Sequence, residues 1–316
     1  MLSYRHAFHA GNHADVLKHA VQALILEALS IKDKGFSYID THSGAGGYAL
    51  DHEWTQKKSE YLTGIAPLWQ TREQWPELAG YFAAISAMNN AMHADAIHHE
   101  NSDHNDHEHG ATALDFYPGS PKVAEYFKRP QDSLTLMELH NNEVELLREN
   151  MAPQNRRSGR NGSGRNKGPT IHHQDGFSGL IGLLPPTPKR GLVLIDPPYE
   201  LKEDYQTLVE TMVQAHKRWP IGIYAIWYPL LAKDVDRSAG LKTALANCGF
   251  DKVLCAELSV SPQAQDFGMY GSGMMILNPP WKLDEQLNSL LPRLAETLGQ
   301  ATNAGAWRLE WLKRAD

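Results

Sequence analysis

The chain has 316 residues, of which 42% are hydrophobic and 21% charged, and its formal net charge is −7. This length suits one large domain or a domain with an insertion, and the negative charge excludes a globally basic nucleic-acid coat protein. Two cysteines cannot build a disulfide framework, which indicates a reducing compartment. No apolar run approaches the roughly 20 residues that span a bilayer, and the N-terminus lacks the apolar core of a signal peptide, so we expect a cytoplasmic protein.

The first predicted element is a helix that begins after Asn12, a residue type that often caps helices. Its apolar side chains recur at three- to four-residue spacing and predict one apolar face, made of Val16, Leu17, Ala20, Val21, Leu24, Ile25, Ala28 and Leu29. A strand at 36–40 follows, and it runs directly into a glycine loop at 43–48.

Five further short apolar runs predict strands, at 134–137, 192–195, 221–227, 253–260 and 274–277. Most of these runs are continuous rather than alternating, which is typical of strands buried on both faces. Helical patterns lie between several of the strands, at 205–219 and 241–248, and a last helix is expected from 283 to 298. Strands that alternate with helices predict an α/β fold with a mostly parallel sheet flanked by helices.

Three segments interrupt this pattern. The stretch 53–92 carries aromatic and aliphatic residues without a strand signal, and we interpret it as a small helical insertion. The stretch 93–110 holds six of the sixteen histidines and five acids, and 152–168 holds four arginines and one lysine without an acid. Both lack the apolar content that offsets the entropy of ordering, so we expect two mobile loops. The catalytic α/β domain would then comprise 1–52 and 111–316.

The strongest chemical signal is Asp196-Pro197-Pro198-Tyr199, directly after a predicted buried strand. Ligands in open α/β sheets bind beyond the carboxyl ends of the strands, and the prolines make the turn rigid. The Asp196 carboxylate and the Pro197 carbonyl can then accept hydrogen bonds from one exocyclic amino group, while Tyr199 stacks on a planar base, a contact worth ~1–3 kcal/mol. The alternative is a proline turn in which Asp196 caps the next helix.

Other strand ends carry groups that could hold a cofactor. Asp40 could orient the glycine loop or meet a cationic ligand group, and Gly44 allows the backbone to approach a ligand closely. Glu138 follows the strand at 134–137, where one carboxylate can accept both ribose hydroxyls, although a surface glutamate is an equal alternative. Asp175, followed by Gly176 and an aromatic residue, could accept a hydrogen bond from an adenine amine.

Three stretches together resemble a known family. They are the opening Met1-Leu-Ser-Tyr-Arg-His-Ala-Phe-His-Ala-Gly-Asn-His-Ala-Asp-Val-Leu-Lys-His19, the loop Asp40-Thr-His-Ser-Gly-Ala-Gly46, and the motif at 196–199. The chain resembles the RlmJ family, bacterial 23S ribosomal RNA adenine-N6 methyltransferases, from Met1 to the Asn278-Pro279-Pro280-Trp281 region and beyond.

The resemblance implies a Rossmann-like methyltransferase fold and S-adenosylmethionine as the cofactor. It implies catalytic roles for Asp196, Pro197 and Tyr199. It further implies cofactor contacts for His19, His42, Asp40, Gly44, Ser120, Glu138, Asp175 and Gly176. In this family the N-terminal segment lies over the cofactor and the target base, so Tyr4 and Lys18 are candidates for positioning the flipped adenosine or its phosphate. The alternatives are a frayed terminus for Tyr4 and a solvated helix lysine for Lys18.

The expected reaction is methyl transfer to the N6 of an adenine in 23S rRNA that is protein-free or part of an early assembly intermediate. No membrane and no obligate protein partner are expected. The histidines at 93–110 could bind zinc or nickel loosely, but their spacing is not fixed, so we expect no metal site. Two alternatives remain: the same chemistry on DNA adenine or protein glutamine, or a non-catalytic RNA-binding protein that stores metal in its histidine-rich loop.

Overall fold

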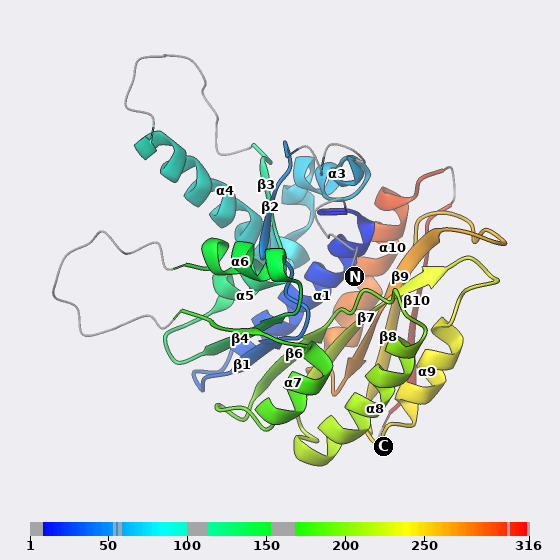
Figure 1. Cartoon of the computed structure of the whole chain (residues 1–316). Coiled ribbons are helices and arrows are strands. Elements are labelled where there is room, and N and C mark those ends of the chain that lie inside the picture. The colour runs from blue at the N-terminus through cyan, green and yellow to red at the C-terminus, as the bar shows by residue number, and fades with distance from the viewer. Residues whose placement is uncertain are drawn as a thin grey trace.

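The computed structural model describes residues 9–52, 55, 59–99, 113–152, 168–301 and 304–314, and for 95–99 the backbone only. A central sheet is covered by helices on both faces (Figure 1). Three features expected from the sequence, Tyr4 and most of the loops at 93–110 and 152–168, lie outside the described residues.

The central sheet has eight strands in the order β10-β8-β9-β7-β6-β1-β4-β5. Four of the seven pairs of neighbouring strands are parallel, and the three pairs that involve β9 or β10 are antiparallel. The predicted α/β class with a mostly parallel sheet is confirmed. The strand bounds are β1 (Ser37–Asp40), β4 (Ser133–Glu138), β5 (Thr170–His173), β6 (Gly191–Ile195), β7 (Ile223–Leu231), β8 (Val253–Ser259), β9 (Met269–Leu277) and β10 (Ala306–Lys313).

The strand order reverses at β1. From β1 the chain proceeds to β4 and β5 on one side, and then returns to β6 and β7 on the other side. Such a reversal opens a crevice beyond the carboxyl ends of the central strands, where ligands of open α/β sheets bind. The residues that follow β1, β4 and β6 therefore meet at one place.

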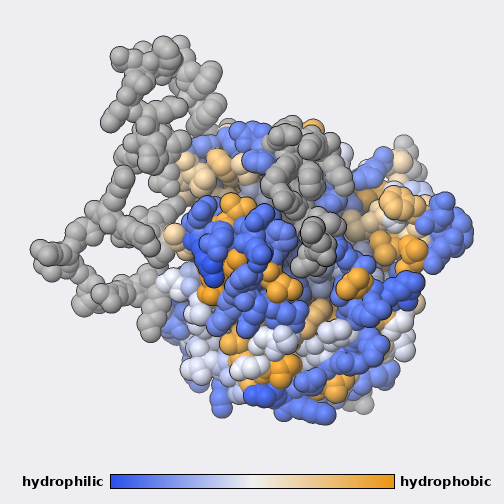
Figure 2. Space-filling model, viewed as in Figure 1, coloured by the Kyte–Doolittle hydropathy of each residue, from blue (hydrophilic) through white to orange (hydrophobic). Residues whose placement is uncertain are grey.

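Two hydrophobic clusters hold the helices on the sheet. Side chains of α1 (His13–Ser30), α5 (Ser120–Phe127) and α10 (Leu283–Leu298) pack on one face. Side chains of α7 (Gly176–Leu183), α8 (Glu203–Arg218) and α9 (Ser238–Ala246) pack on the other, and α6 (Asn141–Asn150) contacts β4 and β5. Hydrophilic residues dominate the visible outer surface, with hydrophobic residues scattered among them (Figure 2).

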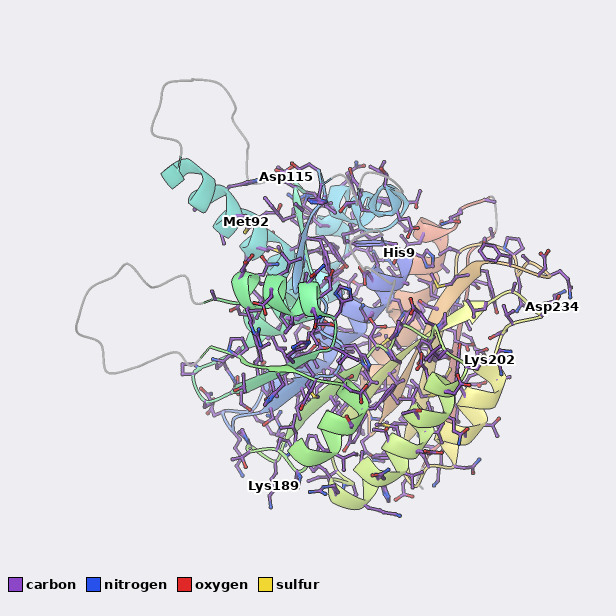
Figure 3. The ribbon with its side chains drawn as sticks, in the orientation of Figure 1. His9, Met92, Asp115, Lys189, Lys202 and Asp234 are labelled. Atoms are coloured by element: carbon purple, nitrogen blue, oxygen red, sulfur yellow. The ribbon has the colours of Figure 1, made fainter. Side chains whose placement is uncertain are left out.

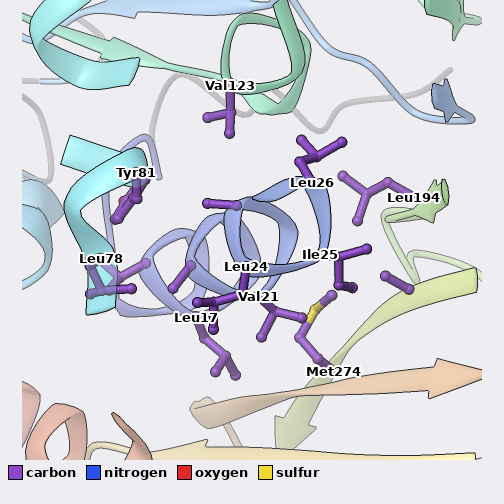
Figure 4. Close-up of a cluster of buried hydrophobic side chains, with 14 of the residues drawn as sticks. Leu17, Val21, Leu24, Ile25, Leu26, Leu78, Tyr81, Val123, Leu194 and Met274 are labelled. Carbon is purple, nitrogen blue, oxygen red and sulfur yellow. The ribbon is translucent and has the colours of Figure 1, made fainter. Parts of the chain in front are cut away.

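Helix α1 lies at the centre of the molecule. Asn12 caps it as predicted, because its side-chain oxygen accepts the N–H groups of Ala14 and Asp15. The sequence predicts one apolar face, but 15 of the 18 residues of α1 are buried. Figure 4 shows its apolar side chains surrounded by residues from several elements, among them Leu78, Leu194 and Met274. Polar residues of α1 are therefore buried as well, and buried polar groups need partners.

A helical segment lies between two short strands, β2 (Gly47–Ala49) and β3 (Phe116–Pro118), which pair with each other. It contains the 3₁₀ helices η2 (Glu60–Thr63), η3 (Arg72–Gln74) and η4 (Pro76–Leu78) and the helices α3 (Ile65–Gln70) and α4 (Ala79–His99). Helix α4 continues past Met92, labelled in Figure 3, so residues 93–99 are helical where the sequence predicts the start of a mobile loop.

The sequence does not predict β10, which pairs with β8 at the edge of the sheet. Most of its residues are partly exposed, so β10 lacks the continuous apolar run that reveals the inner strands. Among the described residues, no helix is both long enough and apolar enough to cross a membrane.

Candidate active site

A cavity of about 520 Å³ opens beyond the carboxyl ends of β1, β4 and β6, where the strand order reverses. Its walls come from the first half of α1, the loops after these three strands, the start of α7 and the middle of β7. Ten of the predicted site residues line it: Lys18, His19, His42, Gly44, Ser120, Glu138, Asp175, Gly176, Asp196 and Pro197.

The motif after β6 places its carboxylate at the cavity. Ile195 is fully buried in the sheet, whereas the Asp196 side chain is 17% exposed and lines the cavity together with Pro197. Tyr199 lies behind this wall and does not line the cavity. Its hydroxyl donates to the carbonyl oxygen of Trp227 over 2.7 Å, and its ring lies 4.6 Å from that of Tyr205. The stacking role of Tyr199 on a base stays a prediction.

Lys18 lies between two carboxylates. Its Nζ is 2.5 Å from Oδ2 of Asp196 and 2.9 Å from Oδ1 of Asp15, and its side chain is only 6% exposed. Burial by itself lowers the pKa of Lys18, but Asp15 and Asp196 together raise it well above its ordinary value, so the amine is charged. The structure thus joins Lys18 to the carboxylate of the motif rather than leaving it as a solvated helix lysine.

Asp40 supports the glycine loop through hydrogen bonds and does not itself line the cavity. Its carboxylate accepts hydrogen bonds from the hydroxyls of Tyr38 and Ser120, both over 2.7 Å, and from the N–H of His42. Burial raises the pKa of Asp40 to about 6, and the bonds from Ser120 and Tyr38 oppose this shift. Of the two roles that the sequence left open, the geometry favours orientation of the loop over contact with a ligand.

Two carboxylates, one at the end of β4 and one after β5, hold the walls of the cavity in place through hydrogen bonds. Glu138, at the end of β4, accepts the N–H of Gly44 over 2.8 Å and that of His140 over 2.7 Å. Asp175 caps α7 by accepting the N–H of Ser178. A side chain at Gly176 would place its Cβ 2.1 Å from the carbonyl oxygen of Thr41, so only glycine lets α7 approach the loop after β1 this closely.

The two histidines of the cavity make different contacts. The His42 ring lies 2.8 Å from the Thr41 hydroxyl and edge-on to Phe177, and burial lowers its pKa to about 4 against the opposing effect of Asp196 and Asp175. His42 is therefore neutral near pH 7. His19 is fully buried, and its Nδ1 lies 2.8 Å from the hydroxyl of Tyr117.

Acidic groups dominate the charge of the cavity. Six of its lining residues carry carboxylates, and Lys18 is the single lysine or arginine among the described lining residues. The acids are Glu138, Glu143, Asp175, Asp196, Glu200 and Asp204. These carboxylates are hydrogen-bond acceptors, so they fit a cationic ligand that carries hydroxyl and amino groups, such as S-adenosylmethionine with its sulfonium. Among the described residues, no group of three His, Cys, Asp or Glu side chains has the arrangement of a metal site.

Comparisons with known proteins identify the family of this chain. A family model described as "Ribosomal RNA large subunit methyltransferase D, RlmJ" matches residues 33–313. The chain belongs to this family. It is 41% identical to the ribosomal RNA large subunit methyltransferase J of Escherichia coli strain K12 and 40% identical to that of Haemophilus influenzae. Each match spans 312 residues and covers 99% of both proteins.

A solved structure resembles the whole fold. The crystal structure of protein LPL1258 from Legionella pneumophila is 32% identical to this chain, with a TM-score of 0.77, and the match covers 96% of this chain and 98% of that one. Together with the family match, the mostly parallel sheet flanked by helices confirms the Rossmann-like methyltransferase fold implied by the sequence.

Several residues at the site were not predicted from the sequence, and three of them are adjacent to the predicted ones. Trp227 and Glu143 line the cavity, and Asp15 lies 2.9 Å from Lys18. Trp227 could have been found, because it stands near the end of a predicted strand, as Asp196 and Glu138 do. Asp15 gave no such signal, because an acid in the first turn of a helix is common at any helix start.

Proposed function

We propose that this chain transfers the methyl group of S-adenosylmethionine to the N6 atom of an adenine in 23S ribosomal RNA. The observation that carries the proposal is that Asp196, at the end of β6, opens onto the same cavity as Glu138 and Gly44, at the ends of β4 and β1. A carboxylate that can bind an amino group, Asp196, and a carboxylate that can bind ribose hydroxyls, Glu138, therefore line the same cavity.

Asp196 and Pro197 orient the target nitrogen. Lys18 binds Oδ2 of Asp196, and the described residues leave Oδ1 available to accept one N6 hydrogen. The Pro197 carbonyl would accept the other, which favours a tetrahedral nitrogen whose lone pair can attack. When bound, S-adenosylmethionine supplies an electrophilic methyl group on a sulfonium. Tyr199 remains the proposed aromatic neighbour of the base, although its ring lies outside the cavity lining and its hydroxyl donates to the carbonyl oxygen of Trp227.

The remaining predicted residues would hold the cofactor. Glu138 uses lone pairs beyond those that accept the Gly44 and His140 N–H groups to bind the ribose hydroxyls. Asp175, which lines the cavity, would accept a hydrogen bond from the adenine amine, and Gly176 lets the start of α7 approach Thr41 closely. Neutral His42 adds no positive charge beside a sulfonium. His19 and Ser120 also line the cavity, and Asp40 holds Ser120 in place by accepting a hydrogen bond from its hydroxyl.

The substrate is expected to be 23S rRNA that is protein-free or in an early assembly intermediate. The adenine must leave its stack to reach the cavity, which costs a few kcal/mol and less in a loop or unfolded RNA. Tyr4 and Lys18 are proposed to position it, although Tyr4 lies outside the described residues. Both cysteines are buried without a disulfide, which supports a reducing compartment and hence the cytoplasm as the site of the reaction.

The test is Asp196→Ala, with incorporation of tritiated methyl into protein-free 23S RNA as the readout. We expect methyl transfer to be lost while calorimetric binding of S-adenosylmethionine persists. Asp251→Ala, an exposed carboxylate before β8, is the matched control and should leave transfer unchanged. Transfer that survives in the Asp196 variant would overturn the mechanism.

The alternative functions give other outcomes with the same protein. Faster methylation of DNA adenine or of a glutamine peptide than of 23S RNA, measured side by side, would change the substrate but keep the chemistry. Absence of S-adenosylmethionine binding, with loss of function on deletion of 93–109, would favour a non-catalytic RNA-binding protein.

A further inference from the structure

The edge of the sheet opposite the cavity is strongly basic. Because β1, β4, β6 and β7 are parallel neighbours, the segments that lead into them meet at this edge. These segments, 31–36, 128–132, 184–190 and 216–222, carry eight lysines and arginines against two acids, a formal charge of +6 in a chain of −7. We call them the basic edge, whose cations are Lys32, Lys34, Lys128, Arg129, Lys189, Arg190, Lys217 and Arg218.

Hydrogen bonds join the four segments into one continuous surface. The carbonyl oxygen of Lys34 accepts from both Arg129 and Arg190, at 3.3 and 3.2 Å. Burial and the positive charge of Arg129 lower the pKa of Arg190, as expected for neighbouring guanidinium groups. The carbonyl oxygen of Lys189 accepts the indole N–H of Trp219 over 3.2 Å, which attaches the end of α8 to the same surface. Figure 3 labels Lys189 at the lower edge of the molecule.

Most of this positive charge has no acid to balance it. Asp132 is buried and pairs with Arg129 at 2.9 Å, so Asp33 is the exposed acid of the basic edge. Four lysines are exposed and form no ion pair within the parts of the chain that the structure describes, namely Lys32, Lys34, Lys189 and Lys217.

A structural role explains only part of the cluster. Arg129 and Arg190 donate to the last carbonyls of α1, where cations also interact favourably with the helix dipole. The exposed lysines make no such bonds, and their mutual repulsion destabilises the fold unless an anion binds. The basic edge therefore has the charge and the accessibility of a surface for a polyanion.

We propose that the basic edge binds phosphates of the RNA substrate, so that the RNA contacts the enzyme at two opposite edges of the sheet. The proposal rests on the proposed function, in which the substrate is RNA. The cavity carries six carboxylates and one lysine among its described lining residues, so it repels the backbone of the RNA whose base it receives. Attraction for that backbone has to come from other surfaces, and lysine and arginine supply it through phosphate contacts.

The distance between the two edges sets the length of RNA that can reach both. They are separated by β6, Gly191–Ile195, which spans roughly 17 Å at about 3.3 Å per residue. A short oligonucleotide whose base occupies the cavity does not reach the basic edge, whereas a long folded RNA can pass around the molecule. The basic edge should therefore act on long RNA alone.

The first experiment measures the affinity for a long fragment of 23S RNA by fluorescence anisotropy at a series of salt concentrations. The variant replaces Lys32, Lys34, Lys189 and Lys217 by glutamine. Each lost phosphate contact lowers the slope of log affinity against log salt by about 0.7–0.9, so we expect the slope to fall by about 3 and the affinity near 0.1 M salt to fall by about tenfold or more.

A pair of double variants provides the matched control. Lys34→Gln with Lys189→Gln removes two unpaired lysines and should lower the slope by about 1.5. Lys282→Gln with Lys313→Gln also removes two exposed lysines, but these pair with Glu285 and Asp251, so the slope should change by less than about 0.5. A four-lysine variant with an unchanged slope, or equal losses in the two double variants, would overturn the proposal.

The second experiment measures the kinetics of methyl transfer. For the long RNA, the four-lysine variant should raise KM by about tenfold and leave kcat unchanged within about twofold. For a short RNA that carries the target adenosine, both constants should stay within about twofold of the unmodified enzyme. An equal loss on short and long RNA would contradict a contact remote from the cavity.

Failure of this inference can be told apart from failure of the proposed function, because the anisotropy measurement needs no methyl transfer. If Asp196→Ala still transfers methyl groups, the site assignment is wrong, and the salt dependence still shows whether the basic edge binds RNA. If Asp196→Ala is inactive but the four-lysine variant keeps its slope, the site stands and the role of the basic edge is excluded.

Discussion

Replacement of Asp40 by asparagine tests whether the loop after β1 depends on a buried carboxyl group with a raised pKa. Asparagine has nearly the same shape, and the hydroxyls of Tyr38 and Ser120 can each donate or accept, so the hydrogen bonds can re-form around the amide. The substitution therefore removes mainly the ionisation of Asp40.

The magnitude follows from the pKa of Asp40. In the folded protein this pKa rises from 3.8 to about 6, so the folded state binds more protons than the unfolded state between these values. The contribution of Asp40 to stability is thus present below pH 4 and declines as pH rises to about 6. A shift of about two pH units corresponds to about 3 kcal/mol.

The assay is urea unfolding followed by tryptophan fluorescence at a series of pH values between 4 and 7. The free energy of unfolding of Asp40→Asn minus that of the unmodified protein should increase by about 3 kcal/mol across this range, or about 4 °C in Tm. Groups that titrate equally in both proteins cancel in the difference. A difference that does not change with pH would refute the reasoning.

Three further predictions concern other residues. Gly176→Ala should weaken S-adenosylmethionine binding, measured by calorimetry, and destabilise the fold by about 1–3 kcal/mol, because its Cβ meets a backbone carbonyl. Gly182→Ala in the same helix has open space around its Cβ and should stabilise the fold by about 0.5–1 kcal/mol. Thermal unfolding measures both changes in stability. Lys242→Met should cost about 3 kcal/mol in urea unfolding, because it leaves the nearly buried Glu257 without its 2.6 Å partner, and an unchanged midpoint would contradict this. The His42 ring should stay neutral down to about pH 5 in an NMR titration, since burial lowers its pKa to about 4, and titration near pH 6.5 would exclude the buried position.

Local patterns in the sequence predicted the fold class and the positions of many helices and strands. The continuous apolar runs at 192–195 and 134–137 predicted strands that the structure buries in β6 and β4. Asn12 predicted the start of α1, and the position of Asp196 after a buried strand predicted that it would lie at a ligand site, where the structure has the cavity. These signals are local because burial of a strand or capping of a helix depends on a few neighbouring residues.

The direction of strands was not available from such patterns. The chain carries two similar motifs, Asp196-Pro197-Pro198-Tyr199 and Asn278-Pro279-Pro280-Trp281, and each follows a buried strand. Because β9 runs antiparallel to β7, the second motif lies at the opposite edge of the sheet, where Asn278 donates to the carbonyl oxygens of Pro220 and Gly222 just before β7. Only the first motif reaches the cavity.

The tertiary structure alone also decided the electrostatics of the site. The sequence predicted an α1 helix with one apolar face, and on that pattern Asp15 and Lys18 belong to its solvated side. The sheet, α5, α4 and α10 surround α1 and bury both residues, so each charge must find a partner within the protein. Lys18 forms an ion pair with Asp196, which lies 178 positions away in the chain. Helical periodicity states which side chains share a face, but the path of the whole chain determines what lies opposite that face.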